Sequence, residues 1–411
     1  MEVKAGYKQR EVGVIPEDWE CEKLEEYFSF ISYGFTNPMP TVDHGIFMVT
    51  AADINEGRIQ LESSRKTTEV AYRTLLSPKS KPKKNDILLT KDGSLGRLAL
   101  VGNELICINQ SVAVIRPNEK VEPIFLKMLL ESQRYQRRML EDAGGSTIKH
   151  IYITIVNLMP IAVPANRDEQ RAIAGALSDV EALLGALDQL IAKKRDLKQA
   201  AMQQLLIGQT RLPRFHGEWE VKRLGELAEI ISGGTPKTGE PSYWNGSIKW
   251  CTPTDITGCS GKYLVETERN ISADGLASCS AQLLAAGSLL LCSRATIGEI
   301  RIAGCKICTN QGFKSLVCMP GVSNEFLYYK LLTMKSQMIE RAIGSTFLEI
   351  SKKDTAALEF SIPDLPQQTA IADVLSDMDA ELVALEQRRD KTRDLKQGMM
   401  QELLTGRTRL V

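Results

Sequence analysis

The feature that most constrains this chain is a long segment that occurs twice. Residues 170–212 and 368–410 align without a gap, and both contain the pentapeptide Arg-Asp-Leu-Lys-Gln, at 195–199 and 393–397. Two unrelated helices would not be expected to share such a block, so the chain carries an internal duplication. The two copies lie about half a chain length apart, which favours two similar halves over a set of unrelated domains.

Each copy is predicted to form one long helix. Its apolar residues return at alternating steps of four and three, the spacing along the seam of a coiled coil. Neither copy contains proline, and Gly208 and Gly406 follow the last turns, where a helix is expected to stop. About 40 residues would make a rod about 60 Å long, which favours paired rods over helices that pack only on their own domains. The residues predicted to pair the helices are Ile173, Leu177, Val180, Leu184, Leu187, Ile191, Ile371, Leu375, Met378, Leu382 and Leu385.

The segments before the two helices also correspond. Each begins near a tryptophan, Trp19 or Trp219, and ends in an apolar step to proline, Pro164 or Pro363. Between these points lie short β-rich runs with Gly and Asn turns and one helix. The predicted fold class is therefore α+β, with two similar globular domains in tandem, each followed by a long helix, and the helices paired as an antiparallel coiled coil with pseudo-twofold symmetry. The predicted bounds are 1–165 for the first domain, 166–212 for the central helix, 213–364 for the second domain and 365–411 for the C-terminal helix.

Polar turns recur at matching places in the two domains. Gly-Ser-Leu-Gly at 93–96 follows the apolar run 87–90, and Ala-Thr-Ile-Gly at 295–298 follows the apolar run 289–291. A Gly-Ser-Thr turn occurs in each half, beginning at Gly145 and Gly344. Shared landmarks around divergent loops favour two copies of one binding fold with different specificities.

The charge and cysteine content narrow the possible functions. The 51 lysines and arginines balance the 51 aspartates and glutamates, which argues against nucleic-acid binding by general electrostatics alone. The 9 cysteines are an odd number, mostly within apolar runs, and the chain has only 3 histidines, so we expect reduced thiols and no metal or other cofactor. Cys305 and Cys308 form a CxxC, but Cys308 aligns with Cys107 and is better explained as a strand cysteine.

No membrane or secretion signal is visible in the sequence. No run approaches the roughly 18 apolar residues that a transmembrane helix needs, and the N-terminus lacks an apolar signal core. The expected location is the cytoplasm.

Motifs for three kinds of catalysis are missing or misplaced. The nearest match to the Asn/Asp-Pro-Pro-aromatic motif of adenine methyltransferases, residues 37–40, lacks the aromatic residue that stacks on a flipped base. The nuclease-like pair Pro-Asp at 363–364 and Asp-Leu-Lys at 394–396 is better explained as helix surface, because Asp-Leu-Lys recurs at 196–198 without a preceding Pro-Asp. A P-loop is also absent. We therefore expect no catalytic residues in this chain.

The order of these motifs resembles the specificity (S) subunit of type I restriction-modification systems, over essentially the whole chain. The resemblance rests on the opening Ile-Pro-Glu-Asp-Trp at 15–19, the Leu-Gly and Gly-Ser-Thr turns, and the duplicated Gln-x-x-Ile-Ala-x-x-Leu-Ser-Asp helix that ends in Leu-Leu-x-Gly-x-Thr-Arg-Leu. It implies two target recognition domains, each reading one half of an asymmetric bipartite sequence in double-stranded DNA. It also implies spacer helices that set the half-site distance and dock two methyltransferase (M) subunits.

The assembled complex would be an adenine-DNA methyltransferase and, with restriction/translocase (R) subunits, an ATP-dependent endonuclease. The chain itself would be non-catalytic. Antiparallel pairing of the helices would relate the two domains by a pseudo-twofold axis like that of the DNA strands. Two alternatives stay open: a methylation-only system without a translocase, and a protein-interaction scaffold whose two domains bind proteins and whose rod only spaces them.

Candidate base contacts are the polar residues of the matched turns, because arginine and lysine read guanine edges while serine and threonine are adaptable. The same turns could instead be scaffold, since their positions partly recur in both domains. Two basic clusters, Lys79, Lys81, Lys83 and Lys84, and Arg134, Arg137 and Arg138, could contact DNA or form a solvated loop and an exposed helix face. The predicted DNA-binding residues are Lys91, Ser94, Arg97, Ser146, Thr147, Lys149, Ser293, Arg294, Thr296, Ser345 and Thr346.

The duplication predicts modular specificity. Replacing residues 217–360 with the equivalent segment of another family member should change one half-site of the recognised sequence and leave the other unchanged. Mapping the modified DNA sequence of the hybrid checks this, and a change in both half-sites would contradict modularity.

Overall fold

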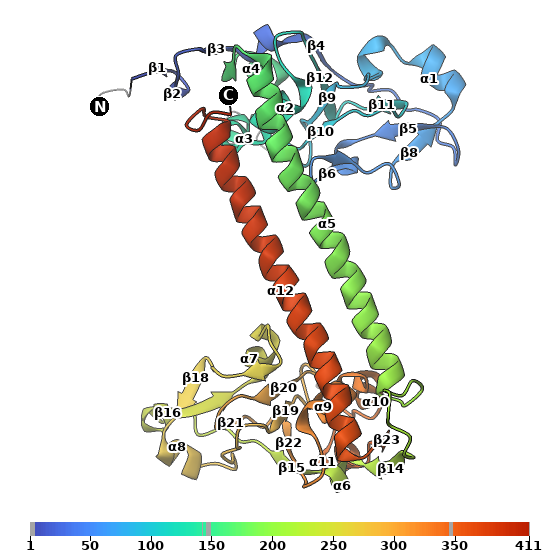
Figure 1. The fold of residues 1–411 in the computed structure, drawn as a ribbon, viewed down its shortest axis with the longest axis vertical. Helices are drawn as coiled ribbons and strands as arrows, with labels where there is room; N and C mark the ends of the chain where they lie inside the picture. Colours follow the sequence, from blue (N-terminus) through green and yellow to red (C-terminus); the bar gives the residue numbers. More distant parts are fainter. Residues whose placement is uncertain (1–4, 142, 145–148, 345–347, 411) are drawn as a thin grey trace. The chain divides into compact units, whose positions relative to one another are not determined.

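The computed structural model describes residues 5–141, 143–144, 149–344 and 348–410. It divides into two compact units: the first combines residues 1–187 with 388–411, and the second comprises residues 188–387. Each unit therefore contains one globular domain and a stretch of both long helices (Figure 1). Among the described residues, no helix combines the length and the apolarity needed to cross a bilayer.

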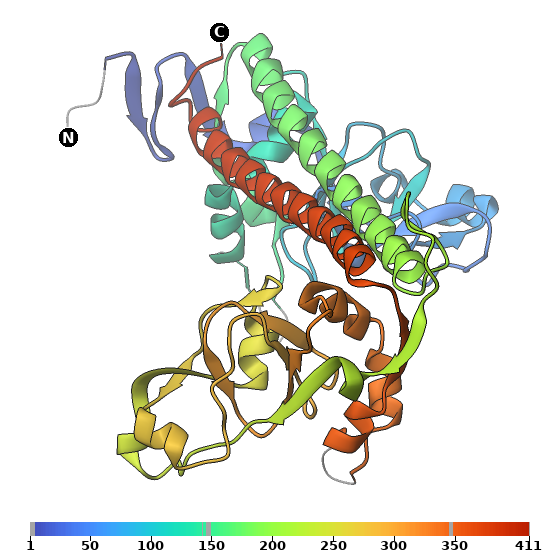
Figure 2. The ribbon, with the colours of Figure 1, turned by 60° about the horizontal axis from the view of Figure 1, so that its bottom comes forward.

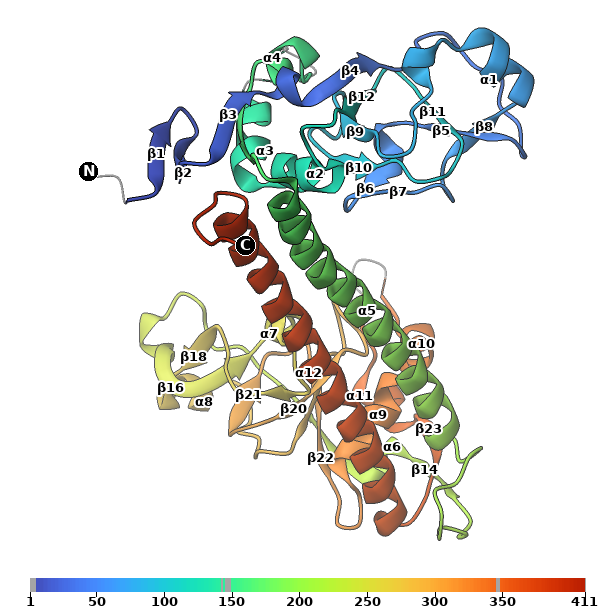
Figure 3. The same ribbon diagram turned by 45° about the horizontal axis from the view of Figure 1, so that its top comes forward.

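The globular part of the first unit contains a four-stranded antiparallel sheet, a three-stranded sheet and four short helices (Figure 3). Its strands are β1 (Tyr7–Arg10), β2 (Gly13–Pro16), β3 (Trp19–Lys23), β4 (Phe28–Tyr33), β5 (Ile46–Val49), β6 (Ile54–Asn55), β7 (Arg58–Ile59), β8 (Arg65–Thr67), β9 (Ile87–Thr90), β10 (Leu98–Leu100), β11 (Ile106–Ile108), β12 (Val112–Pro117) and β13 (Pro160–Pro164). Its short helices are α1 (Glu69–Leu75), α2 (Pro123–Glu131), α3 (Gln133–Glu141) and α4 (Ile153–Asn157). The strand orders are β10-β9-β12-β4 and β11-β5-β8, and β3 pairs with β13.

The globular part of the second unit repeats this plan (Figure 2). Its strands are β14 (Glu220–Arg223), β15 (Ala228–Ser232), β16 (Trp244–Cys251), β17 (Tyr263–Leu264), β18 (Arg269–Ile271), β19 (Leu289–Leu291), β20 (Ile300–Ala303), β21 (Ile307–Thr309), β22 (Lys314–Cys318) and β23 (Glu359–Ile362). Its short helices are α6 (Leu224–Leu227), α7 (Pro253–Gly258), α8 (Ala273–Ala277), α9 (Asn324–Leu332), α10 (Lys335–Glu340) and α11 (Lys352–Ala356). The strand orders are β15-β22-β19-β20-β17 and β18-β16-β21, and β14 pairs with β23.

The two strand plans match element by element. The order β4-β12-β9-β10 corresponds to β15-β22-β19-β20, and in both three-stranded sheets the middle strand pairs parallel to one neighbour and antiparallel to the other. The second unit adds β17 at the edge of its larger sheet. The predicted α+β class with two similar domains in tandem is therefore confirmed.

The two predicted long helices are α5 (Arg167–Leu205) and α12 (Leu365–Leu403), each of 39 residues. In the second unit, Lys194 of α5 pairs with Glu381 of α12 at 2.6 Å, and Lys198 pairs with Asp379. In the first unit, Lys396 of α12 lies 3.5 Å from Glu181 of α5. Because the residue number rises along α5 as it falls along α12, the ion pairs of the second unit run antiparallel. Coiled-coil geometry and the pseudo-twofold axis stay predictions.

The residues predicted to form the helix seam have two kinds of surroundings. Ile173 and Leu177 are fully buried in the core of the first unit, with α2 and β13, while Ile371 and Leu375 are buried in the equivalent core of the second unit. The first turns of each helix thus hold it to its own globular domain. Further along the helices, Leu187, Ile191 and Leu382 are buried, whereas Val180, Leu184, Met378 and Leu385 are half-buried.

The end of each long helix completes the core at its unit. Leu403 and Leu404, at the end of α12, belong to the core of the first unit, and Leu205 and Leu206, at the end of α5, belong to the core of the second. The glycines predicted to stop the helices have φ angles of 73° at Gly208 and 70° at Gly406. Each also lies so close to a tryptophan, Trp219 or Trp19, that a Cβ would approach the indole at 3.2 Å. Glycine is therefore required for both the backbone conformation and the packing.

Arg409 fastens the end of the chain to the first unit. Its guanidinium donates to both carboxylate oxygens of Asp18, at 2.9 and 2.7 Å, and to the carboxylate of Glu169, at 2.8 Å from Oε2. The Glu169 side chain is fully buried, so this guanidinium offsets the cost of burying its charge. The hydrogen bonds from Arg409 also hold the pKa of Asp18 below its usual range.

Replacing Arg409 with alanine should lower the free energy of unfolding of the first unit by about 3 kcal/mol, at the low end for a buried pair because Arg409 is partly exposed. Urea denaturation measures this loss, and Arg407→Ala, which removes an exposed charge nearby, should cost less than about 0.5 kcal/mol. Because the pKa of Asp18 is lowered in the folded state, its share of the difference should be present at neutral pH. It should begin to fall near the usual aspartate pKa and disappear as pH falls through the lower, folded-state pKa. Equal losses in the two variants would contradict this role for Arg409.

Candidate functional site

Three chain segments meet at the end of β9 in the first unit and at the end of β19 in the second. They are the polar turn after the strand, the loop before the neighbouring strand β12 or β22, and the segment that follows the Gly-Ser-Thr turn. We refer to this place as the loop junction. It is formed by Lys91, Asp92, Ser111, His150 and Ile151 in the first unit and by Ser293, Arg294, Gly312, Glu349 and Ile350 in the second.

The backbone hydrogen bonds of the two loop junctions are the same. In the first unit, the Lys91 amide donates to the Ser111 carbonyl at 2.9 Å, and the Ile151 amide donates to the Lys91 carbonyl at 3.0 Å. In the second, the Ser293 amide donates to the Gly312 carbonyl at 2.8 Å, and the Ile350 amide donates to the Ser293 carbonyl at 3.0 Å. Turns that are far apart in the sequence therefore lie side by side in both units.

The side chains of the first junction are held by a carboxylate. Asp92 accepts from Lys91 Nζ at 2.8 Å and lies 2.5 Å from His150 Nδ1. Partial burial acts to raise the pKa of Asp92, but the hydrogen bonds from Lys91 and His150 outweigh it and leave the pKa below its usual range. Asp92 therefore stays ionised and ties the turn after β9 to the segment that ends at His150.

The second junction has a carboxylate where the first has an imidazole. Glu349 takes the place of His150, and its carboxylate accepts from Lys314 Nζ at 2.8 Å. Lys314 is only 6% exposed, and its Nζ also lies 3.4 Å from the hydroxyl of Ser293. The Glu349 side chain thus binds strand β22, whereas the Asp92–His150 contact joins the equivalent segment of the first unit to the turn after β9. The same backbone therefore presents different chemistry in the two units.

Most of the predicted binding residues that the structure describes lie at or beside these junctions. In the first unit, Lys91 is part of the junction, Lys149 is exposed next to His150, and Arg97 donates to the Ile54 carbonyl at 3.1 Å. The Ser94 carbonyl accepts from the Thr90 hydroxyl, which closes the turn. Ser146 and Thr147 lie outside the described residues.

In the second unit, the turn after β19 is tight. Ala295 has a φ of 60°, and the Thr296 amide donates to the Arg294 carbonyl at 2.7 Å. Arg294 and Thr296 are half-buried, but Ser293 is 0% exposed, which argues against a direct base contact by that residue. Ser345 and Thr346 lie outside the described residues. Ser293 is better explained as a partner of Lys314.

An aromatic and basic patch beside the first junction escaped the sequence reasoning. Tyr33, at the end of β4, is 40% exposed, and the Nζ atoms of Lys79 and Lys91 each lie 5.4 Å from the centre of its ring. Lysine over an aromatic ring is a favourable cation–π arrangement. The structure thus connects one basic cluster, which could have been only a solvated loop, to the junction. The one sequence signal was the matching position of Tyr33 before a glycine, within Ile-Ser-Tyr-Gly.

Within the described ranges, no group of three or more His, Cys, Asp or Glu side chains is placed to hold a metal ion. The cysteines are free thiols, and burial raises the pKa of Cys308 to about 12. A thiol with a raised pKa is a poor nucleophile and a poor metal ligand at neutral pH. Cys308 lies in β21, opposite Trp250 of β16, which fits the interpretation of a strand cysteine.

Comparisons with known proteins identify the family to which this chain belongs and a solved structure with a similar fold. The family described as Type I restriction modification DNA specificity domain matches twice, at residues 16–193 and 216–392. The MjaIX specificity subunit of a type I restriction enzyme from Methanocaldococcus jannaschii is 36% identical over 42% of this chain, which corresponds to 40% of the relative's length. A second protein of that organism, provisionally named the type I restriction enzyme MjaX specificity subunit, is 23% identical over 98% of this chain and 97% of its own length. The crystal structure of a type I restriction-modification S subunit from M. genitalium has a TM-score of 0.60, with 18% identity and 98% coverage of both chains.

Replacing His150 with a carboxylate should loosen the first loop junction, and a compensating lysine at position 92 should restore it. His150→Glu would place a second carboxylate beside Asp92, so the Ile151 amide should exchange its hydrogen with solvent about fivefold faster. Adding Asp92→Lys should restore the slow exchange by recreating an attractive pair. Hydrogen–deuterium exchange measured by mass spectrometry tests both, with the Ile350 amide of the second junction as the internal control. No recovery in the double variant would show that the pair does not hold this segment.

Proposed function

Because the chain belongs to the family of type I restriction-modification DNA specificity domains, we propose that it is the DNA-recognition subunit of a type I restriction-modification complex. Specificity subunits of this family are non-catalytic. In this proposal, each globular domain is a target recognition domain that reads one half of an asymmetric, two-part sequence in double-stranded DNA. The domains comprise residues 1–165 and 213–364, and the spacers comprise 166–212 and 365–411.

The observation that carries this proposal is the loop junction, which has one backbone arrangement and two sets of side chains. A binding scaffold that is duplicated for two different targets needs a constant frame and variable contact residues. Asp92 and His150 in the first unit are replaced by Arg294 and Glu349 at the same backbone positions in the second. Because bases are distinguished by their donors and acceptors, such a change should select different half-sites.

The contact residues that we propose lie on the exposed side of these junctions. In the first unit they are Lys91, Ser94, Arg97 and Lys149, to which we add Tyr33 and Lys79 from the neighbouring patch. In the second unit they are Arg294 and Thr296. Ser146, Thr147, Ser345 and Thr346 remain in the proposal from the sequence alone. Lysine and arginine can bind guanine edges or phosphates, and the exposed ring of Tyr33 can pack on the sugar or the base.

We further propose that the chain acts with two methyltransferase subunits and with restriction/translocase subunits. The assembled complex would methylate adenine in DNA and cleave unmodified DNA with ATP. Long helices α5 and α12 would set the distance between half-sites and dock the methyltransferases. The cytoplasmic location predicted from the sequence belongs to the same proposal, because the DNA that such a complex acts on lies there.

A protein-interaction scaffold is the competing function. The basic and aromatic patch of Tyr33, Lys79 and Lys91 favours DNA, because a protein-binding face would gain little from lysines held over an exposed ring. Salt separates the two functions: DNA binding releases counterions and weakens steeply with ionic strength, whereas an apolar protein interface does not.

The proposal is tested by co-expressing this chain with the methyltransferase subunit of its system in a host without DNA methylation. Long-read sequencing of the host DNA should show modified adenines in an asymmetric two-part motif with a fixed gap. The same methyltransferase expressed alone is the control and should leave the DNA unmodified. A stable complex that modifies no sequence would contradict DNA recognition by this chain and favour the scaffold.

A further inference from the structure

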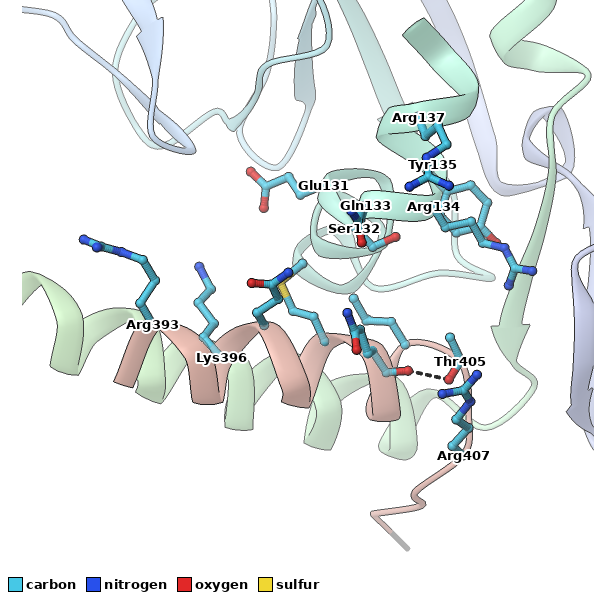
Figure 4. A pocket seen from close by; sticks show the side chains of 14 residues that line it. Glu131, Ser132, Gln133, Arg134, Tyr135, Arg137, Arg393, Lys396, Thr405 and Arg407 are labelled. Carbon is cyan, nitrogen blue, oxygen red and sulfur yellow. Dashed lines mark hydrogen bonds between the residues drawn. The ribbon is translucent and has the colours of Figure 1, made fainter. Parts of the chain in front are cut away.

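The first unit contains a groove between α3 and the last turns of α12 (Figure 4). Its volume is about 670 Å³. We refer to it as the α3–α12 groove. It is lined by Glu131, Ser132, Gln133, Arg134, Tyr135, Arg137, Arg393, Lys396, Gln397, Met400, Gln401, Leu404, Thr405 and Arg407.

The groove has an apolar floor and a basic rim. Tyr135 and Leu404 are buried and Met400 is half-buried, so these side chains lie at the bottom. The rim carries five basic residues from both helices and the turn after α12, of which Lys396 is half-buried. Figure 4 shows the side chains of Arg393 and Lys396 rising from α12. The rim residues are Arg134, Arg137, Arg393, Lys396 and Arg407.

Few carboxylates balance this rim. The one acidic lining residue, Glu131, is paired with Lys127 of its own helix at 2.9 Å. Within the described part of the chain, no ion pair is formed by Arg134 or Arg137. The pairs of Arg393 and Arg407, at 3.3 and 3.7 Å, are exposed, and Lys396 lies 3.5 Å from Glu181. Exposed pairs of this kind are worth little, so the rim can form new ones without losing much.

The groove is long enough to hold one face of a short helix. Its α12 wall runs from Arg393 to Thr405, which at 1.5 Å per residue is about 18 Å, or about three helical turns. An apolar floor between basic edges complements a helix with one apolar ridge and acidic flanks. A DNA backbone would match the basic rim but would bury nothing against Met400 and Leu404, so a protein helix fits the groove better.

The second unit has a counterpart groove with different chemistry. It has a volume of about 440 Å³ and is lined by Met202, Gln203, Ile207, Lys330, Thr333, Met334, Gln337, Glu359, Phe360 and Ser361. The one basic lining residue, Lys330, is buried and donates to the Leu206 carbonyl at 2.8 Å. The end of α5 takes the place here that the end of α12 has in the first unit.

The matched positions explain the missing rim. The turn glycines Gly96 and Gly298 pack on Gln136 and Lys335, and the buried Tyr135 matches the buried Met334. Arg134 and Arg137 therefore correspond to Thr333 and Ser336. Neither Thr333 nor Ser336 carries a charge, and Thr333 lines the counterpart groove. The duplication has therefore kept the position of the groove and lost the free positive charge in one copy.

We propose that each groove docks a helix of one methyltransferase copy, and that the two copies are held unequally. The first unit binds an apolar helix with acidic flanks through its charged rim, whereas the second binds the same helix through apolar contacts alone. This inference rests on the proposed function for the identity of the partner. It goes beyond that function because two copies of one partner would leave the complex at different salt concentrations.

The experiment follows the mass of the purified complex by native mass spectrometry and light scattering as NaCl is raised. Screening shortens the reach of charges from about 8 Å at 0.15 M salt to about 3 Å at 1 M. We expect two methyltransferase copies at low salt and one at high salt. Arg134→Gln with Arg137→Gln should weaken binding of the salt-sensitive copy about tenfold.

The matched control is Arg134→Lys with Arg137→Lys, which keeps both charges and should behave like the unchanged chain. Loss of both copies together, or identical salt profiles for the glutamine and lysine variants, would overturn the inference. Two retained copies with weakened DNA binding in the glutamine variant would also overturn it and assign the rim to DNA. A complex that loses one methyltransferase copy at high salt but modifies no DNA would support the groove inference and contradict the proposed function.

Discussion

The structure depends on the burial of helix ends in cores that begin far away in the sequence. Leu403 and Leu404 complete the core of the first unit, as Leu205 and Leu206 complete that of the second. Fully burying a leucine is worth about 1.5–3 kcal/mol, so each pair contributes as much as a large fraction of a domain's net stability. The first core is therefore incomplete until the last residues of the chain are in place, and Arg409 adds a charge that the buried carboxylate of Glu169 requires.

This constraint separates the parts of the domain that are fixed from those that can vary. Helix ends, the tryptophans that pack on Gly208 and Gly406, and the central sheet must keep their shape for both cores to close. The turns after β9 and β19 lie at strand ends and are not needed to close the cores. Their side chains can therefore change while the backbone hydrogen bonds remain. Binding residues on loops held by a rigid scaffold follow the same logic in many folds.

Repeated sequence patterns predicted the helices and domains correctly. Contacts between side chains of different loops could not be predicted, because they depend on how the strands are paired. Periodicity and the glycine stops predicted both long helices, and paired landmarks predicted two similar α+β domains. The partnership of Asp92 with His150 could not be predicted, because it depends on which loops meet across the sheet. Nor could the burial of Ser293, since serine in a polar turn is usually exposed. Ile173 was predicted to lie on the seam, but a heptad position cannot tell whether its partner is a helix or a domain core.

The chain has no net charge, but the basic side chains are distributed differently over the two units. The totals cancel, yet the first unit gathers arginines on a groove and lysines around Tyr33. The second unit has Thr333 and Ser336 at the positions of Arg134 and Arg137, and the buried Ser293 at that of Lys91. In a duplicated chain, two copies can differ in their surface charges with little loss of stability, because a surface charge can change without altering the core. A difference in charge at fixed geometry can change which half-site each domain reads and how tightly each helix end holds its partner. Asymmetry of recognition and asymmetry of assembly would then have one physical origin.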